Sequence, residues 1–112
     1  MKFSPSVKLR CRNDFDTVFQ NQTRRWISTS LMIIGCENIQ SHPRLGMVIA
    51  KKRVKRAVDR NRLKRMLRQN FQEKFTHLPA YDFVVLVRRP LTKDQLSQEI
   101  DTEVSSLFRR II

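Results

Sequence analysis

The stretch that most constrains how this chain can fold is KKRVKRAVDRNRLKRMLRQNF, residues 51–71. Its first eighteen residues, through Arg68, carry ten lysines and arginines against one acid, Asp59. A run this dense repels itself and stays disordered unless an anion neutralises it or an apolar face anchors it to a fold. Such a face exists at the helical spacing i, i+3, i+4, i+7 and i+8: Leu63, Met66, Leu67, Asn70 and Phe71. We therefore predict a helix over residues 57–74 that lies on a sheet.

The opposite face of this predicted helix is basic and is a candidate binding surface. The residues that project from it are Asn61, Arg62, Lys64, Arg65 and Arg68, with Arg60 at its boundary. A face that only keeps a protein in solution usually mixes both signs of charge, and this face does not. We expect packing to fix the helix while its cations stay in water, available to a partner.

Composition indicates what kind of partner this is. The chain has 112 residues, 40% of them hydrophobic, and a formal net charge of +13. It fits one domain, residues 1–112, with a modest core. Such a charge raises the local concentration of polyanions, so nucleic acid is the leading partner and an anionic membrane the second. Residues 69–112 carry six bases and six acids, so the charge is concentrated before them.

A membrane partner is disfavoured by the distribution of apolar residues. The longest apolar runs are LMII at 31–34 and FVVLV at 83–87, far below the roughly 20 residues that span a bilayer. The N-terminal MKFSPSVKLRCRNDF lacks an apolar stretch of signal-peptide length. We therefore expect a cytoplasmic protein with no membrane partner.

The sequence does not predict a metal, redox or nucleotide-loop site. Cys11 and Cys36 lie 25 residues apart without a CxxC pair, so we interpret both as buried or idle thiols. His42 and His77 lack ligand neighbours at metal-site spacing. Two glycines leave no room for a GxGxxG or GxxxxGK loop. We expect no cofactor bound by the protein alone.

Groups that could hydrolyse a phosphodiester are also missing from the pattern. That reaction needs metal-binding carboxylates or a positioned acid and base. Asp14 and Asp16 are close in sequence, but residues at i and i+2 on a helix do not face each other. We interpret them as compensation for the charge of a helix N-terminus and predict no catalytic residue.

Period and turn signals predict the first half of the fold. Asn13 can cap a short helix on which Phe15, Val18 and Phe19 share one side. Residues 26–35 begin with polar and apolar alternation and predict one strand.

The second half adds two strands and a helix. Residues 45–50 predict a strand antiparallel to the first by hairpin logic, and 82–87 a strand buried on both faces. Thr92 and Gln95 form a capping box for a last helix. Its apolar stripe is Leu96, Ile100, Val104, Leu107, Phe108 and Ile111. The predicted order is helix, strands, helix, strand, helix.

These residues also carry a resemblance to a known family. AKKRVKRAVDRNRLKRMLRQNF resembles the signature of the protein subunit of bacterial ribonuclease P, in which Arg-Asn-Arg lies inside a basic helix after a Lys-Lys pair that ends a strand. The matching residues here are Arg60, Asn61, Arg62, Lys51 and Lys52. The resemblance covers most of the chain, with DFDTVFQ, RLGMVIAKK, PAYDFVVLVRR and a terminal LFRR in order. A lone RNR tripeptide would carry no weight, but this order and spacing are specific.

The resemblance implies an α+β fold, a small α/β sandwich in which a mixed sheet of about four strands packs with helices. It also implies a left-handed crossover of the basic helix between parallel strands, against the general preference for right-handed ones. The implied partner is a large catalytic RNA, which holds the catalytic magnesium ions and, with the protein, removes the 5′ leader from precursor tRNA. The protein would bind both that RNA and the leader.

Two RNA-binding surfaces follow from the resemblance. Cations that pair with phosphates would face the catalytic RNA: Lys51, Lys52, Arg53, Arg60, Asn61, Arg62, Lys64, Arg65 and Arg68. A cleft between the first helix and the sheet would take the single-stranded leader. Phe15 and Phe19 would stack on its bases, although core packing is an equal alternative. Arg10 and Arg12 would guide its backbone. Some relatives carry a third aromatic residue in the adjoining strand, where a gapless count from Phe19 gives Ile33.

Two other functions remain open from the sequence. A ribosomal or general RNA-binding protein would share the charge and the lack of catalytic groups. A DNA-binding module would use its helix to read base edges, but nearly uniform cations favour phosphates. DNA is therefore the least expected partner.

Overall fold

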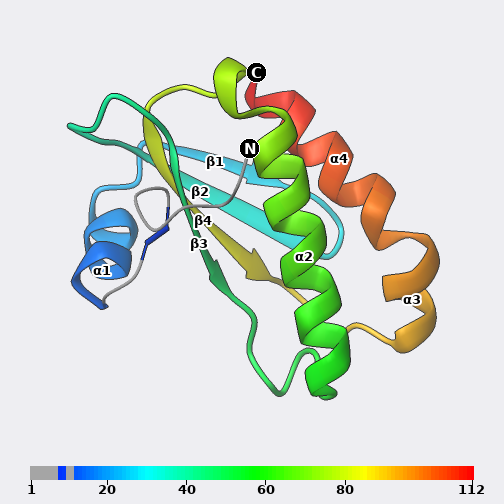
Figure 1. Ribbon diagram of the computed structural model, residues 1–112. Coiled ribbons are helices and arrows are strands. Elements are labelled where there is room, and N and C mark those ends of the chain that lie inside the picture. Colours follow the sequence, from blue (N-terminus) through cyan, green and yellow to red (C-terminus); the bar gives the residue numbers. More distant parts are fainter. Residues whose placement is uncertain (1–7, 10–11) are drawn as a thin grey trace.

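The computed structural model describes residues 8–9 and 12–112 and consists of helices packed on a four-stranded sheet (Figure 1). The elements in chain order are α1 (Arg12–Gln20), β1 (Arg24–Ile27), β2 (Leu31–Glu37), β3 (Arg44–Val48), α2 (Ala57–Glu73), the short 3-10 helix η2 (Phe75–His77), β4 (Tyr81–Val87), α3 (Lys93–Gln98) and α4 (Ile100–Ile111). The sheet is mixed, in the order β1-β2-β4-β3, and only β3 and β4 are parallel. The predicted fold class and element order are confirmed, while the handedness of the crossover through α2 stays a prediction.

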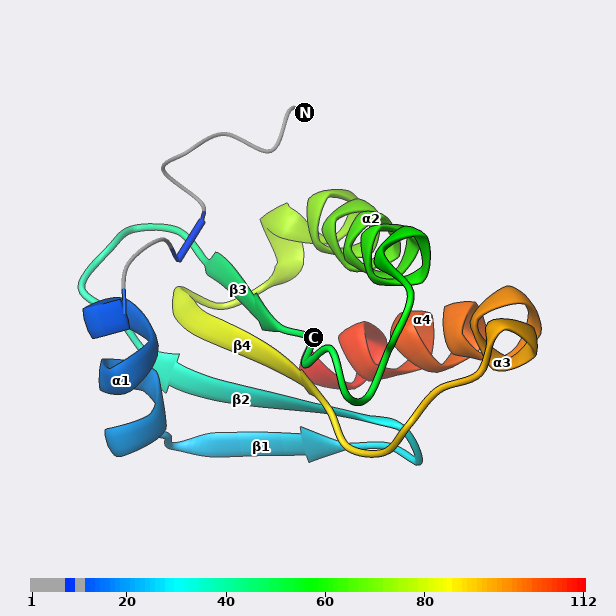
Figure 2. The same cartoon turned by 90° about the horizontal axis from the view of Figure 1, so that it is seen from below.

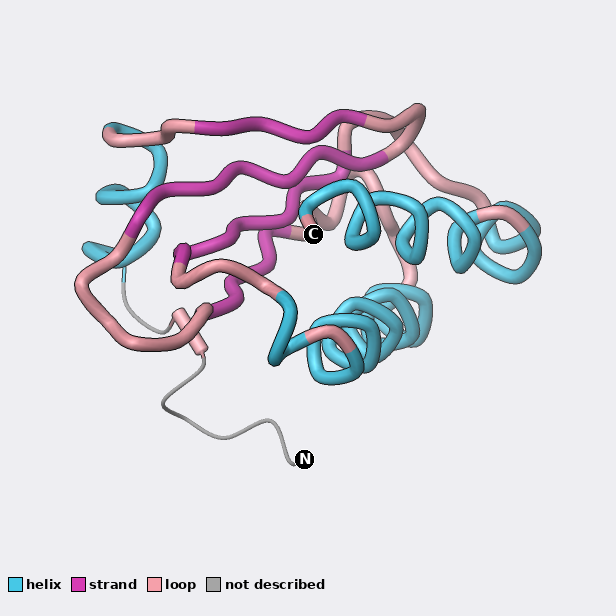
Figure 3. The backbone as a smooth tube through the Cα atoms, turned by 90° about the horizontal axis from the view of Figure 1, so that it is seen from above, coloured by secondary structure: helices cyan, strands magenta, loops and turns pink. Residues whose placement is uncertain are grey.

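The sheet separates two cores of unequal size. In Figure 1, α1 lies on one side of the sheet and α2, α3 and α4 lie on the other; the views in Figures 2 and 3 show the same arrangement. The larger core lies between the sheet and α2, α3 and α4, and its fully buried aromatic residues include Phe71, Phe83 and Phe108. A smaller core lies beneath α1 and contains Val18 and Ile34.

The basic helix is anchored as its apolar periodicity predicts. α2 buries Leu63, Leu67, Asn70 and Phe71, and Met66 is half-buried against the larger core. The sheet side of the helix was therefore predicted correctly.

The pairing of β3 was predicted wrongly. We expected it to form an antiparallel hairpin with the preceding strand, but it pairs in parallel with β4, which lies between β2 and β3. The register aligns Leu45 with Phe83 and Met47 with Val85. The apolar run of β4 suits this central position, because a strand covered on both faces needs apolar side chains on both. The six residues between β2 and β3 have the length of a hairpin loop. Nothing in that part of the sequence shows that β4, which follows later in the chain, lies between the two strands.

The single strand predicted at 26–35 is instead a hairpin. The chain turns after β1, where the Ser28 N–H donates to the Leu31 carbonyl at 2.9 Å. The Glu103 carboxylate of α4 accepts hydrogen bonds from the Ser28 hydroxyl and the Ser30 N–H. A serine-rich segment can alternate like a strand and still turn, because its hydroxyls bond to nearby backbone.

Two helix ends differ from the prediction and one agrees. α1 begins at Arg12, so Asn13 lies inside the first turn, where its carbonyl accepts from the Thr17 hydroxyl, and does not cap the helix. The capping box of Thr92 and Gln95 is present. The last helix is divided at Glu99 into α3 and α4. The predicted apolar stripe is buried throughout, at Leu96, Ile100, Val104, Leu107, Phe108 and Ile111.

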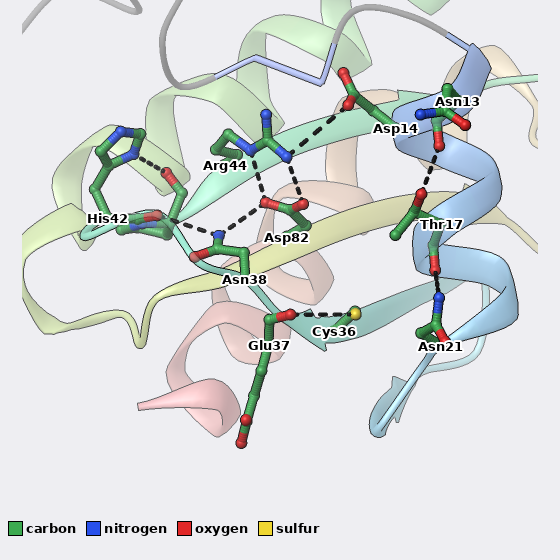
Figure 4. A network of polar contacts seen from close by, with 11 residues as sticks. Asn13, Asp14, Thr17, Asn21, Cys36, Glu37, Asn38, His42, Arg44 and Asp82 are labelled. Carbon is green, nitrogen blue, oxygen red and sulfur yellow. Dashed lines mark hydrogen bonds and ion pairs between the residues drawn. The ribbon is translucent and has the colours of Figure 1, made fainter.

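A polar network links three strands and α1 at the end of the sheet where β3 and β4 begin and β2 ends (Figure 4). Arg44 of β3 donates to both carboxylate oxygens of the buried Asp82 of β4, at 2.8 and 2.7 Å. Asn38, which follows β2, donates to the same carboxylate at 2.8 Å. Asp14 lies in the first turn of α1, as interpreted from the sequence, whereas Asp16 lies beyond that turn. The Asp14 carboxylate is 4.0 Å from Nη2 of Arg44. The ion pair between Asp14 and Arg44 therefore links α1 to the start of β3.

Candidate nucleic-acid interface

The basic face of α2 is presented to solvent. Asn61, Arg62 and Arg65 are exposed, and Lys64 and Arg68 are half-buried at its flank. Leu67, on the opposite side of the helix, is only 1% exposed, so the predicted division of the helix into an apolar and a basic side is confirmed. The helix thus presents guanidinium and ammonium groups on a rigid element, a geometry suited to phosphates.

Two of the predicted cations also support the fold. Arg60 folds back, and its Nη1 donates to the carbonyls of Val54 and Lys55, both at 2.9 Å. The Nη1 of Arg53 donates to the Arg88 carbonyl at 2.7 Å. These contacts fix the loop before α2, so the loss of Arg60 or Arg53 would disturb structure as well as charge.

The exposed side of α2 borders two open hollows. One is lined by Asn61, Arg65, Arg68, Gln69 and Gln72. The other lies towards α3 and α4, where Arg62 and Arg65 line it together with Asp101 and Leu96. Asp101 adds a negative charge to the second hollow, whereas the first hollow has no acid in its lining. The first hollow is therefore more attractive to a polyanion.

A third hollow brings the two predicted surfaces together. It has a volume of about 160 Å³, and its lining includes Phe15 of α1, Gly46 of β3, and Lys64 and Arg68 of α2. A Cβ atom on Gly46 would come within 2.6 Å of Cε1 of Phe15, so only glycine lets the ring lie against β3. Lys64 and Arg68, predicted to face the catalytic RNA, therefore lie beside a residue predicted to face the leader.

The phenylalanines of α1 differ in exposure. Phe15 is half-buried against the smaller core, whereas Phe19 is 37% exposed. Core packing therefore explains the position of Phe15 better than that of Phe19. Arg10 lies outside the described residues, and although Arg12 begins α1, its side chain is outside them too.

An apolar row crosses the sheet beyond the part covered by α1. Cross-strand partners align Ile27, Met32, Leu86 and Val48 on the α1 side of the sheet, one residue from each strand. The ends of this row are exposed, Ile27 at 41% and Val48 at 38%. The row is an apolar surface of the kind on which unpaired bases rest, and Phe19 is a separate exposed aromatic on the same side of the sheet.

Ile33 does not belong to this surface. It is completely buried in the larger core, on the opposite face of the sheet from α1. The residues of β2 on the α1 side are Met32, Ile34 and Cys36. The gapless count therefore selected a residue that faces away, because alternation along a strand makes an error of one residue reverse the face.

The described residues offer little chemistry of their own. Among residues 8–9 and 12–112, no group of three histidine, cysteine or acidic side chains could hold a metal ion. Burial, with smaller effects from Asp82 and Glu37, raises the pKa of the Cys36 thiol, so it stays protonated at neutral pH and is a weak nucleophile. No helix in the same part of the chain is both long and apolar enough to cross a bilayer.

Some lining residues were missed from the sequence. Lys8 and Gly46 line the hollow with Phe15, and Gln69 and Gln72 line the hollow beside Arg65. A glycine inside a strand is a signal of close approach, and it could have pointed to Gly46. Lys8 carries no such signal, because only the folded chain brings it beside β3.

Comparison with known proteins gives consistent matches. The profile of the family described as Ribonuclease P matches residues 3–112. The Ribonuclease P protein component of Proteus mirabilis is 43% identical over 111 residues, covering 98% of this chain and 91% of that protein. The protein of the same name from Idiomarina loihiensis is 31% identical over 111 residues, covering 99% and 88%.

Solved structures agree with the sequence matches. The RNase P protein from Thermotoga maritima has a TM-score of 0.77 at 26% identity, covering 92% of both chains. The Staphylococcus aureus RNase P protein has a TM-score of 0.76 at 23% identity, covering 94% of this chain and 91% of that one, a likeness of fold.

Proposed function

Because this chain belongs to the ribonuclease P protein family, we propose that it binds two RNA segments on adjoining surfaces, one on α2 and one between α1 and the sheet. Members of the family are protein subunits of the endoribonuclease that processes the 5′ end of tRNA, and this chain is such a subunit. In the proposal, α2 binds the catalytic RNA, and the magnesium ions of the reaction belong to that RNA.

The observation that carries the proposal is the hollow shared by Phe15, Lys64 and Arg68. It makes the aromatic side of α1 continuous with the cations of α2. A single-stranded leader could rest its bases on Phe19 and the apolar row while its phosphates reach Lys64 and Arg68. Asn61, Arg62 and Arg65, on the outer side of α2, then remain for the catalytic RNA.

The direct test is cleavage of precursor tRNA by the cognate catalytic RNA at low magnesium concentration, with and without this protein. We expect the protein to stimulate cleavage, because its cations offset the phosphate repulsion that magnesium otherwise screens. An absence of stimulation would contradict the function. A general RNA-binding protein would bind both RNAs and leave the cleavage rate unchanged.

The division between the surfaces has its own test. Lys64→Ala should weaken binding of precursor tRNA more than binding of mature tRNA, whereas Arg62→Ala should weaken binding of the catalytic RNA. Both measurements use the same salt concentration, since phosphate contacts are salt-dependent. Equal effects of Lys64→Ala on precursor and mature tRNA would contradict the assignment of Lys64 to the leader.

A further inference from the structure

A hollow at the end of the fold, away from α1, includes Lys52 and Arg53 of the predicted catalytic-RNA surface, but most of its lining residues belong to neither predicted surface. Its lining comes from the loop that enters α2, the first turn of α2 and the loop that enters α3. The two loops lie at the lower end of the molecule in Figure 1. Its volume is about 350 Å³, within the roughly 300–1,000 Å³ range of small-molecule sites. We call it the loop hollow.

The loop hollow is lined both by apolar residues and by cations, which we call its rim cations. Pro90 and Leu91 contribute apolar surface to its lining. The rim cations are Lys52, Arg53, Lys55, Arg56 and Lys93. The only acid among the lining residues is Asp59, and its carboxylate is 3.8 Å from Nε of Arg56, which offsets its charge. The lining therefore has five bases and one acid, an excess of four positive charges.

The walls of the loop hollow are held by hydrogen bonds between the two loops. The Leu91 N–H donates to the Arg53 carbonyl at 2.8 Å, and Nη1 of Arg53 donates to the Arg88 carbonyl at 2.7 Å. Leu91 itself is 8% exposed and belongs to the larger core. A site whose walls are already held in place loses little conformational freedom when a ligand enters.

We propose that the loop hollow binds an unpaired nucleotide of the RNA partner, with the base on Pro90 and Leu91 and the flanking phosphates at Lys52, Lys55 and Arg56. An apolar surface and cations in one hollow match a nucleotide, which joins a flat, weakly hydrated base to an anionic backbone. A regular duplex hides its bases and would use the rim cations alone. Lys55, Arg56 and Lys93 thereby gain an RNA-binding role, although none of them is among the nine residues predicted from the sequence to face the catalytic RNA.

This inference rests on the proposed function only for the class of partner, so it can be tested on the free protein. The probes are adenosine, guanosine, cytidine and uridine 5′-monophosphates, with ribose 5-phosphate as the matched ligand that lacks a base. Binding is followed through the backbone amide signals of the full-length ¹⁵N-labelled protein. We expect the nucleotides to shift the signals of Lys55, Leu91 and Thr92, and to bind at least about fivefold tighter than ribose 5-phosphate, as stacking of one base demands.

A pair of charge reversals supplies the control. Lys55 and Arg109 are both exposed, and Arg109 lies on α4, away from the loop hollow. Lys55→Glu should weaken nucleotide binding at least about fivefold, and Arg109→Glu by less than about twofold, since charges beyond a Debye length are largely screened. Equal binding of ribose 5-phosphate and the nucleotides, or equal effects of both reversals, would overturn the inference.

The inference and the proposed function fail in different ways. If the protein stimulates cleavage of precursor tRNA but nucleotides leave the Leu91 and Thr92 signals unshifted, only the inference is wrong. If nucleotides shift those signals but cleavage is not stimulated, the proposed function is wrong and the inference stands. In the complex with catalytic RNA, Lys55→Glu should also raise the chemical reactivity of particular unpaired bases, and unchanged reactivity would contradict the inference.

Discussion

Helices α2 and α4 pack together on the same face of the sheet and bury apolar stripes in the same core, yet their charges are arranged differently. α4 has Asp101 and Glu103 in its first turn and Arg109 and Arg110 in its last, which suits the dipole of the helix itself. α2 has Asp59 in its first turn and no base in its last turn, and its cations lie along its middle. The charges of α4 thus suit its own helix dipole, whereas Arg62 and Arg65 of α2 are exposed away from the helix ends.

The contacts of the two helices follow the same division. Glu103 of α4 accepts hydrogen bonds from Ser28 and Ser30, and Nη1 of Arg110 donates to the Ile27 carbonyl at 2.9 Å. These bonds fasten the β1–β2 hairpin. On α2, by contrast, Asn61 and Arg65 line an open hollow. The difference teaches that a charge on an amphipathic helix is informative about function when the fold gives it no local use.

The largest expected effects are on stability and concern the apolar core that α2 and α4 share. Leu67 of α2 and Leu107 of α4 are each 1% exposed in the same core. Leu67→Ala and Leu107→Ala should each lower the free energy of unfolding by about 2–5 kcal/mol, because each leaves a cavity. Urea unfolding followed by circular dichroism measures both. The conservative Leu→Met changes should cost less than about 1.5 kcal/mol. If Leu67→Ala had no effect on stability, α2 would not be anchored as described.

A second prediction concerns the acid of α4. Glu103→Ala should lower the free energy of unfolding by about 1.5–3 kcal/mol, since it removes charge-assisted hydrogen bonds to the β1–β2 turn. Glu103→Gln keeps one acceptor and should cost less. The affinity of the folded variants for catalytic RNA should stay unchanged at fixed salt. A marked change in that affinity would remove the contrast between α4 and α2.

A third prediction separates the two phenylalanines of α1. Phe19→Ala should weaken precursor tRNA binding by about 1–3 kcal/mol through the loss of a base stack, and leave mature tRNA binding and thermal stability nearly unchanged. Phe15→Ala should lower stability as well, because Phe15 packs against the smaller core. Thermal unfolding and binding of the two tRNA forms measure both variants. Equal losses for precursor and mature tRNA with Phe19→Ala would return this residue to a packing role.

The parts of the fold that the sequence predicts well are those fixed by local pattern. The apolar spacing of α2 and the capping box at Thr92 depend on neighbours within a few residues, so both are confirmed. The partner of β3 depends on β4, which lies beyond a whole helix in the chain, and hairpin logic could not find it. The turn at Ser28 is stabilised by Glu103, 75 residues away, and was missed for the same reason.

The candidate site divides in a similar way. The charge density of residues 51–68 is visible in the sequence, and the helical spacing of the apolar residues indicates which side of the helix is exposed. Contacts that only the fold creates are not visible in the sequence. They include the hydrogen bond from Arg60 to the Val54 carbonyl and the hollow that Lys64 and Phe15 line together. The loop hollow likewise needs two loops that are distant in the chain, which is why Lys55 and Lys93 were not among the predicted RNA-binding residues.

The measurement that tests the contrast between the helices most directly is the salt dependence of catalytic-RNA binding for Arg65→Ala and Arg109→Ala. Both arginines are exposed on neighbouring helices, so the two changes remove the same charge from different places. Arg65→Ala should weaken binding and reduce the slope of log K against log salt by somewhat under one unit, the loss of about one phosphate contact. Arg109→Ala should leave affinity and slope close to those of the unmodified protein. Equal reductions in the two variants would mean that the protein binds as a diffuse polycation and that α2 has no special role.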